Sequence, residues 1–201
     1  MTLIGLHGPA GAGKDTAADF LRTWGFQALA LADPIRWGLC AMLGEFGVDE
    51  QLLNDRKTKE AVIPGLGKSP RELMQTLGTE WGRQQVNASL WTALAEERIL
   101  KLEPLPGFPL AVAITDIRFD SEARWLRDLG GKIWRIYRPR SGPGVNPHVS
   151  ELGLPEDLVD YVVPNIGTIE EFHNELRVAI FRNFAPLRDA RAFNPTEEPI
   201  A

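Results

Sequence analysis

Cysteine is almost absent from this sequence: Cys40 is the only one among 201 residues, so no disulfide can form within the chain. A chain without disulfides suits a reducing compartment, and we expect a cytoplasmic protein in which Cys40 is a small core residue. The N-terminal stretch MTLIGLHGPAGAGK lacks both the basic segment and the long apolar run of a secretory signal. We therefore expect neither a signal peptide nor a membrane span.

Positive charge is not in excess either. The 22 Lys and Arg residues are outnumbered by 27 Asp and Glu residues, which gives a formal net charge of -5. This balance argues against binding to a nucleic-acid polymer, although a local cluster of Arg and Lys can still hold a small anion. The histidines His7, His148 and His173 lack metal-ligand spacing, and we expect them to be structural or surface residues.

Apolar runs that predict strands alternate along the chain with periodic segments that predict helices. The predicted strands are residues 3–6, 27–31, 110–114, 132–137 and 161–163. The main predicted helices cover 15–24, 33–43, 90–102, 119–129 and 169–184, and another opens at Ser69. This alternation predicts an α/β fold with three layers, α/β/α, around a five-stranded parallel sheet whose ligands gather at the carboxyl ends of the strands.

The length suits one domain over residues 1–201. Within it we expect a largely helical region at 33–102, with only partial helix at 44–67. A loop rich in Pro, Gly and Arg follows at 138–150, and the tail at 185–201 has little apolar periodicity and is expected to be loosely held.

Residues 8–14, GPAGAGK, match the pattern G-x-x-x-x-G-K between a predicted strand and a predicted helix. Glycines let successive backbone N–H groups turn toward phosphate oxygens, the helix start adds its positive end, and Lys14 can reach the β- and γ-phosphates. Asp15 stands where the motif usually has Ser or Thr, and Thr16 follows it. Asp15 can bind Mg²⁺ or cap the helix, and Thr16 can offer its hydroxyl to the α-phosphate.

The segment Thr115-Asp-Ile-Arg118 follows a buried strand. There Asp116 has the position of a carboxylate that holds Mg²⁺ or its water, and Arg118 the position of a phosphate ligand. The alternative is an exposed ion pair at a helix start. Arg138 and Arg140 follow the next strand, where they can close over a triphosphate or belong to a plain solvated loop.

Further polar candidates lie in the helical region. Asp33 and Arg36 follow the second strand, and Asp33 is expected to cap the helix that begins there, with Pro34 at its first position. Ser69 and Glu72 predict a capping box at the start of another helix. On this helix Arg71, Gln75 and Arg83 lie away from the apolar face, and the Gln amide suits a base edge. Trp81 and Trp91 can stack on a base or belong to the core, which we favour for at least one of them.

Taken together, these segments resemble the bacteriophage-type deoxynucleoside monophosphate kinase family. The resemblance extends from residue 1 to about residue 180. Its segments are GPAGAGKDTAADFL, LADPIRWGL, SPRELMQTLGTEWGRQ, TDIRFDSEARWLRDLGGKIWRIYRP, HVSELGLP and VVPNIGTIEEF. Since GKDT in place of GK[ST] is a feature of that family, Asp15 supports the resemblance.

The resemblance implies a P-loop NTPase fold of the nucleoside monophosphate kinase type, with a helical acceptor-binding insertion and a lid loop. It implies ATP, Mg²⁺ and a deoxynucleoside monophosphate acceptor, in a host cytoplasm if the chain is encoded by a phage. ATP is then held by residues that include Gly8, Gly11, Ala12, Gly13, Lys14, Asp15, Thr16, Arg138 and Asn165. Acceptor candidates are Asp33, Arg36, Arg71, Gln75, Arg83, Trp91 and Arg118, with Lys14, Arg118 and Arg138 acting in catalysis and Asp15 and Asp116 on the metal.

Two alternatives remain open. One is another small P-loop kinase, similar to dephospho-coenzyme A kinase, and the other is a nucleotide-binding regulatory module without an acceptor. The absence of the guanine-reading sequence N-K-x-D argues against a GTPase. The sequence leaves both a monomer and a homodimer open.

Overall fold

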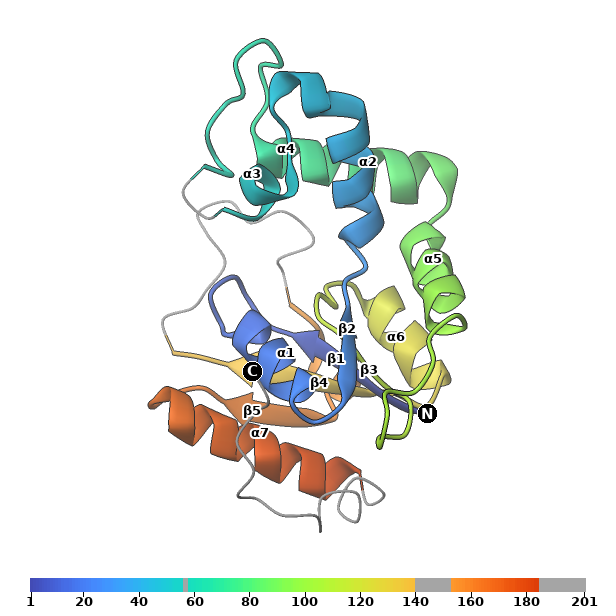
Figure 1. The fold of residues 1–201 in the computed structure, drawn as a ribbon, viewed down its shortest axis with the longest axis vertical. Helices are drawn as coiled ribbons and strands as arrows, with labels where there is room; N and C mark the ends of the chain where they lie inside the picture. The colour runs from blue at the N-terminus through green and yellow to red at the C-terminus, as the bar shows by residue number, and fades with distance from the viewer. Residues whose placement is uncertain (56–57, 140–152, 185–201) are drawn as a thin grey trace. The chain divides into compact units, whose positions relative to one another are not determined.

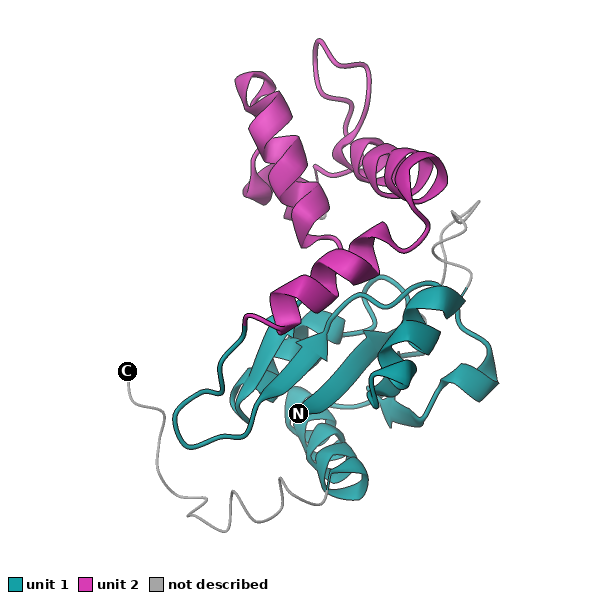
Figure 2. Ribbon diagram, turned by 90° about the vertical axis from the view of Figure 1, so that its right-hand side faces the viewer, with its two compact units in different colours: residues 1–29, 102–201 teal, residues 30–101 magenta. Residues whose placement is uncertain are grey.

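The computed structural model describes residues 1–55, 58–139 and 153–184 (Figure 1). The chain divides into two compact units, which we call the sheet unit (residues 1–29 and 102–201) and the helical unit (residues 30–101), shown separately coloured in Figure 2. The helical unit has nearly the bounds of the region for which the sequence predicted acceptor binding, and that role stays a prediction. The expectations for Arg140, His148 and the tail at 185–201 lie outside the described residues.

The sheet unit contains a five-stranded sheet in which every neighbouring pair of strands is parallel. Its strand order is β2-β3-β1-β4-β5, and the prediction of a five-stranded parallel sheet is confirmed. All four residues of β3 are buried, as its continuous apolar sequence requires. The strands are β1 (Thr2–His7), β2 (Phe26–Leu29), β3 (Ala111–Ile114), β4 (Lys132–Tyr137) and β5 (Tyr161–Pro164).

Helices cover both faces of this sheet, which confirms the three-layer prediction. On one face, α1 (Lys14–Arg22) and α7 (Ile169–Asn183) pack with alternate strand residues such as Ile4 and Leu6. The opposite face of β1 meets α6 (Asp120–Asp128), so closely that a Cβ on Gly5 would lie 2.7 Å from Leu126. A short 3₁₀ turn, η4 (Glu156–Leu158), precedes β5. Helices thus cover both faces of the sheet, and a ligand would bind at the carboxyl ends of its strands.

The helical unit consists of short helices joined by turns. They are α2 (Asp33–Leu43), the 3₁₀ turn η1 (Gly44–Phe46), α3 (Glu50–Asn54), α4 (Pro70–Gln75), the π-helix η2 (Thr76–Val86) and α5 (Leu90–Ile99). The predicted capping box of α4 is present, since Ser69 Oγ accepts from the Glu72 N–H and the Glu72 carboxylate accepts from the Ser69 N–H. The hydrogen bonds that the Ser69 N–H and the Ser69 hydroxyl donate to the Glu72 carboxylate lower the pKa of Glu72.

The π-helix η2 continues directly from α4 and was not predicted. Both of its glycines, Gly78 and Gly82, are buried. A Cβ on Gly78 would lie 2.9 Å from Ile35 of α2, and one on Gly82 would lie 2.2 Å from the Trp91 ring of α5. The missing side chains let η2 approach both of its neighbours closely. None of the helices in the described segments combines the length and the apolar character that crossing a bilayer requires.

Candidate functional site

The glycine-rich loop joins β1 to α1 at the carboxyl edge of the sheet. Gly8 has a φ of 147°, and a Cβ there would lie 2.7 Å from the Ile136 carbonyl oxygen. Gly13 has a φ of 106°, and a Cβ there would lie 2.5 Å from Asn165 Nδ2. Both positions require glycine for conformation and for space. The loop therefore passes close to the ends of β4 and β5.

Lys14 is the first residue of α1 and turns back over the loop. Its Nζ donates to the carbonyl oxygens of Gly8 at 2.7 Å and Pro9 at 3.0 Å. The residue before it, Gly13, is the N-cap of α1 and has no side chain with which to cap the first N–H groups. Asp15 lies exposed in the first turn of α1, and Thr16 is half-buried. The loop thus offers an ammonium group and a helix N-terminus in one place, an arrangement that favours an anion.

Residues from the ends of β4 and β5 also reach the loop. Asn165 follows β5, donates from Nδ2 to the Ala12 carbonyl at 2.8 Å, and donates its backbone N–H to Tyr137 at 2.7 Å. Arg138 follows β4, and its Nη1 lies 3.5 Å from the Gly11 carbonyl oxygen. The structure therefore brings these two predicted residues together with the glycine loop.

Asp116 and Arg118 follow β3 at the same edge. Asp116 is 8% exposed, and the next N–H, that of Ile117, donates to Leu6 of β1 at 3.1 Å. Arg118 is exposed, and its backbone N–H donates to the buried Glu122 carboxylate at 2.8 Å. A buried carboxylate and an exposed guanidinium thus stand two residues apart beside the loop.

His7, the last residue of β1, is buried and bonded on both sides of its ring. Its Nδ1 lies 3.0 Å from the Ile117 carbonyl oxygen, and its Nε2 lies 3.3 Å from the Leu154 nitrogen. We assign the proton to Nδ1, because the Leu154 N–H then donates to a bare Nε2. Burial is the largest influence on His7 and lowers its pKa. The hydrogen bond to the Ile117 carbonyl raises the pKa by less than burial lowers it, and the nearby charges of Arg135 and Lys14 lower it by still smaller amounts.

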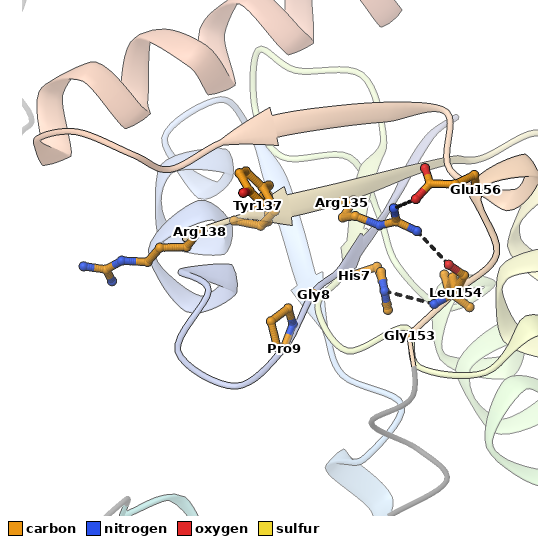
Figure 3. A pocket seen from close by; sticks show the side chains of 10 residues that line it. His7, Gly8, Pro9, Arg135, Tyr137, Arg138, Gly153, Leu154 and Glu156 are labelled. Atoms are coloured by element: carbon orange, nitrogen blue, oxygen red, sulfur yellow. Dashed lines mark hydrogen bonds and ion pairs between the residues drawn. The ribbon is translucent and has the colours of Figure 1, made fainter. Parts of the chain in front are cut away.

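A pocket of about 310 Å³ opens beside Gly8 and Pro9 (Figure 3). On one side of it the Arg135 guanidinium donates to the Leu154 carbonyl at 2.7 Å and pairs with Glu156. Leu154 is therefore held at its N–H by His7 and at its carbonyl by Arg135. Arg135 was not among the residues predicted from the sequence, and His7 was expected to have only a structural or surface role. The only signal was that His7 directly follows one predicted strand and that Arg135 lies within another.

Among the described residues, no group of three His, Cys, Asp or Glu side chains is placed to hold a metal ion. Mg²⁺ in proteins often binds through one or two carboxylates together with substrate phosphates, and Asp15 and Asp116 are the carboxylates beside the loop that could serve such an ion.

In the helical unit, the expectation that Asp33 caps α2 is wrong. Ala32 is the N-cap and Asp33 is the first helical residue. The Asp33 carboxylate instead accepts from the Ala30 N–H at 3.0 Å, from Arg36 Nη1 at 3.0 Å and from Arg98 Nη2 at 2.8 Å. Because both of its oxygens are engaged by the protein, Asp33 links two arginines within this unit.

Arg71, Gln75 and Arg83 lie half-buried on the continuous helix formed by α4 and η2. These three residues are spaced by four and eight positions. In an α-helix each step of four residues rotates the side-chain direction by about 40° around the axis. In a π-helix, which has more residues per turn, a step of four rotates it in the opposite sense, so we expect Arg83, in η2, to point to the same side of the helix as Arg71 and Gln75. Arg71 also pairs through Nε with Glu60 at 2.5 Å.

The two tryptophans of the predicted acceptor region differ in burial. Trp91 is 6% exposed, its ring meets Gly82, and its indole N–H donates to the Gly78 carbonyl at 2.6 Å. Trp81 is 45% exposed. Trp91 therefore belongs to the core of the helical unit, and its contact with a base stays a prediction.

Comparison with family models and with known sequences finds similar proteins whose names agree. The family model described as deoxynucleotide monophosphate kinase matches residues 65–176. A protein of Acanthamoeba polyphaga mimivirus named for deoxynucleotide monophosphate kinase activity is 33% identical over 186 residues, covering 88% of this chain and 94% of the relative. The deoxynucleoside-5'-monophosphate kinase of Escherichia phage T5 is 28% identical, covering 81% of this chain and 89% of the relative.

Among solved structures, TT1252 from Thermus thermophilus is similar in fold. The match has a TM-score of 0.50 and 21% identity, and it covers 90% of this chain and 97% of the other. At 21% sequence identity, this similarity is evidence for a shared fold only.

Proposed function

This chain belongs to the deoxynucleotide monophosphate kinase family, and from that premise we propose that it transfers the γ-phosphoryl group of ATP to a deoxynucleoside monophosphate. The products are ADP and a deoxynucleoside diphosphate. The observation that carries the proposal is the glycine loop with Lys14 at the carboxyl edge of the sheet, in a chain of this family. For the place of action we propose the cytoplasm of a host cell, supported by relatives that are encoded by viruses.

ATP would be held by the loop residues Gly8 to Thr16. The loop fits polyphosphate because Gly8 and Gly13 exclude side chains and leave the backbone to face the ligand. Lys14 would exchange its two bonds to loop carbonyls for bonds to phosphate oxygens, which places its charge at the transferring group. We place Asn165 beside the adenine, supported by its bond to the loop at Ala12.

Mg²⁺ would be held by Asp116 and Asp15, directly or through water. Held there, the ion would supply charge neutralisation to the phosphates of ATP. Asp116 suits this role because its carboxylate is buried at the end of β3, next to the strand that carries the loop. Asp15 suits it because it lies exposed on the first turn of α1.

The acceptor phosphate is a dianion that must approach the polyanionic ATP, so it requires cations beyond Lys14. Arginine binds phosphate through a planar fork that stays charged. We assign Arg118 and Arg138 in the sheet unit to the phosphates, and Arg36, Arg71 and Arg83 in the helical unit to the acceptor. Gln75, on the same helix row as two of these arginines, would read the base edge.

The test is an ADP-release assay over a panel of deoxynucleoside monophosphates, ribonucleoside monophosphates and dephospho-coenzyme A. We expect the fastest turnover with a deoxynucleoside monophosphate. Lys14→Ala should lower turnover on the order of a hundredfold or more without loss of circular dichroism signal, because it removes a charge from a preorganised site. Arg22→Gln, which changes an exposed cation on the same helix, is the matched control and should keep full activity.

Faster turnover with dephospho-coenzyme A or with ribonucleotides would replace the proposed acceptor. ATP binding without phosphorylation of any acceptor on the panel would support the regulatory module instead.

A further inference from the structure

We propose that Arg98 is a positioning residue of this kinase, which orients Arg36 for the acceptor phosphate by acting through Asp33. The inference rests on the proposed function, in which Arg36 binds the acceptor. Nothing in the local sequence around residue 98 suggests it, because Arg98 lies on α5 and Asp33 opens α2.

Arg98 is fixed by three different contacts. Its Nη2 pairs with Asp33 Oδ2 at 2.8 Å, and its Nη1 donates to the Ala30 carbonyl at 3.1 Å. Its guanidinium also lies 4.8 Å from the centre of the Trp37 ring. A planar group held at two nitrogens and stacked on an indole has little freedom to rotate. Arg98 therefore presents its positive charge at a fixed position, and its ion pair holds the Asp33 carboxylate there.

Asp33 transmits that position to Arg36. Its Oδ2 accepts from Arg98 and from the Ala30 N–H, while Oδ1 accepts from Arg36 Nη1 at 3.0 Å. The three side chains are 23 to 25% exposed, so solvent screens the pairing in part but does not abolish it. Two guanidiniums on one carboxylate leave a net positive charge, which suits a neighbouring anion.

Arg36 itself is incompletely satisfied. Within the described residues its Nε is buried and has no hydrogen-bond partner. A buried N–H without an acceptor is disfavoured, so a modest shift of the guanidinium toward an incoming oxygen would be favourable. The link through Asp33 restrains one nitrogen of Arg36 and leaves the rest of its fork to be oriented toward the acceptor.

Lysine is not expected to replace Arg98. It would keep the positive charge but carries a single nitrogen, which cannot serve the Ala30 carbonyl and Asp33 with the same geometry or stack flat on Trp37. The pair of variants Arg98→Gln and Arg98→Lys therefore separates charge from orientation.

The experiment measures kcat and both KM values for the wild type, Arg98→Gln, Arg36→Gln and the double variant, with the best deoxynucleoside monophosphate as acceptor. We expect Arg98→Gln to raise the acceptor KM on the order of tenfold and to leave the KM for ATP unchanged, and Arg98→Lys to recover only part of the loss. In the Arg36→Gln background the further effect of Arg98→Gln should nearly disappear, because coupled residues are non-additive. Lys101→Gln, an exposed cation beyond the end of α5, is the matched control and should behave as wild type.

Additive losses in the double variant, or equal rises in the KM for ATP and for the acceptor, would overturn the positioning role. If Arg98→Gln does not fold, as judged by circular dichroism, the same cycle is run with Arg98→Lys. Additive effects of Arg98→Lys and Arg36→Gln on the acceptor KM would then overturn the positioning role. A wild-type enzyme that phosphorylates no deoxynucleotide overturns the proposed function, and the positioning role with it. An active wild type with additive variants overturns the positioning role alone.

Discussion

At the scale of single residues, His7 shows how one buried imidazole can join three parts of the sheet unit. It ends β1, touches the turn after β3 at Ile117, and accepts from Leu154 ahead of β5. Because burial lowers its pKa, the folded protein binds a proton at His7 less readily than the unfolded chain does. The stability that His7 contributes is therefore complete above about pH 6.5, the pKa of an unperturbed histidine, and is lost as the pH falls below it toward the lowered pKa.

We predict that the free energy of unfolding decreases between pH 7.5 and pH 5.5 partly because the unfolded chain binds a proton at His7 more readily than the folded protein does. His7→Gln should show a shallower decrease over this range, measured by urea denaturation at several pH values. Identical slopes for the wild type and His7→Gln would contradict the role of burial at this residue.

Gly8 and Gly11 offer a second test at this scale, since both have positive φ but differ in their surroundings. A Cβ on Gly8 would meet the Ile136 carbonyl, whereas one on Gly11 would have nothing within 4 Å. We predict that Gly8→Ala destabilises the protein by about 1–3 kcal/mol and that Gly11→Ala costs clearly less, because only Gly8 adds a clash to the backbone strain. Equal losses in urea denaturation would mean that strain alone matters in this loop.

At the scale of elements, the packing of the π-helix η2 predicts an unusual sign for a helix substitution. Gly→Ala inside an open helix normally stabilises by roughly 0.5–1 kcal/mol. Gly82→Ala should instead destabilise by about 1–3 kcal/mol, because the new methyl group would lie 2.2 Å from the buried Trp91 ring. The comparison is Gly44→Ala, at a residue with helical φ and ψ and nothing within 4 Å, which should be neutral or stabilising. Thermal unfolding of the two variants checks the difference, and a stabilising Gly82→Ala would contradict the packing described.

The elements that the sequence predicted well are those with strong local signals. The strand Lys132–Tyr137 has its predicted bounds, because its apolar run is flanked by glycines and by a Pro-rich segment. The capping box at Ser69 was equally clear, because its two residues are close in sequence. By contrast, Asp-Pro at a helix start looks the same whether the Asp is the cap or the first helical residue, so Asp33 was misassigned.

Features that depend on distant residues were not predictable. The contact of Asp33 with Arg98 joins two helices that are far apart in sequence, and no local sequence pattern predicts it. Nor does the residue type decide which tryptophan is buried, since the Trp91 ring packs against Gly82, a residue distant in sequence that leaves room for it. The bonds of His7 to Ile117 and Leu154 likewise depend on the completed sheet. The functional roles of the site residues stay predictions, which the experiments above address.

At the scale of the whole molecule, the proposal assigns two substrates to two sets of residues. We predict that ATP with Mg²⁺ slows amide hydrogen exchange mainly in the loop at residues 8–16 and around Asn165. A deoxynucleoside monophosphate added alone should slow exchange mainly within residues 30–101, since Arg36, Arg71 and Arg83 lie there. Protection of residues 8–16 by the monophosphate alone, without change in residues 30–101, would contradict this division.

The position of the helical unit in the sequence also bears on how the chain reaches its fold. The chain leaves the sheet after Leu29 and returns only after Lys101, yet β2 and β3 are hydrogen-bonded neighbours, with Phe26 opposite Ala111. On the ribosome, β1 and β2 therefore lack β3, the strand that lies between them, until all of residues 30–101 have been synthesised. A compact helical unit shortens the effective loop that β3 has to close, because a folded insertion brings its ends closer than a random coil of equal length. Variants that unfold only the helical unit should then slow the completion of the sheet, and the nascent chain should be most exposed to aggregation just before residue 111 emerges.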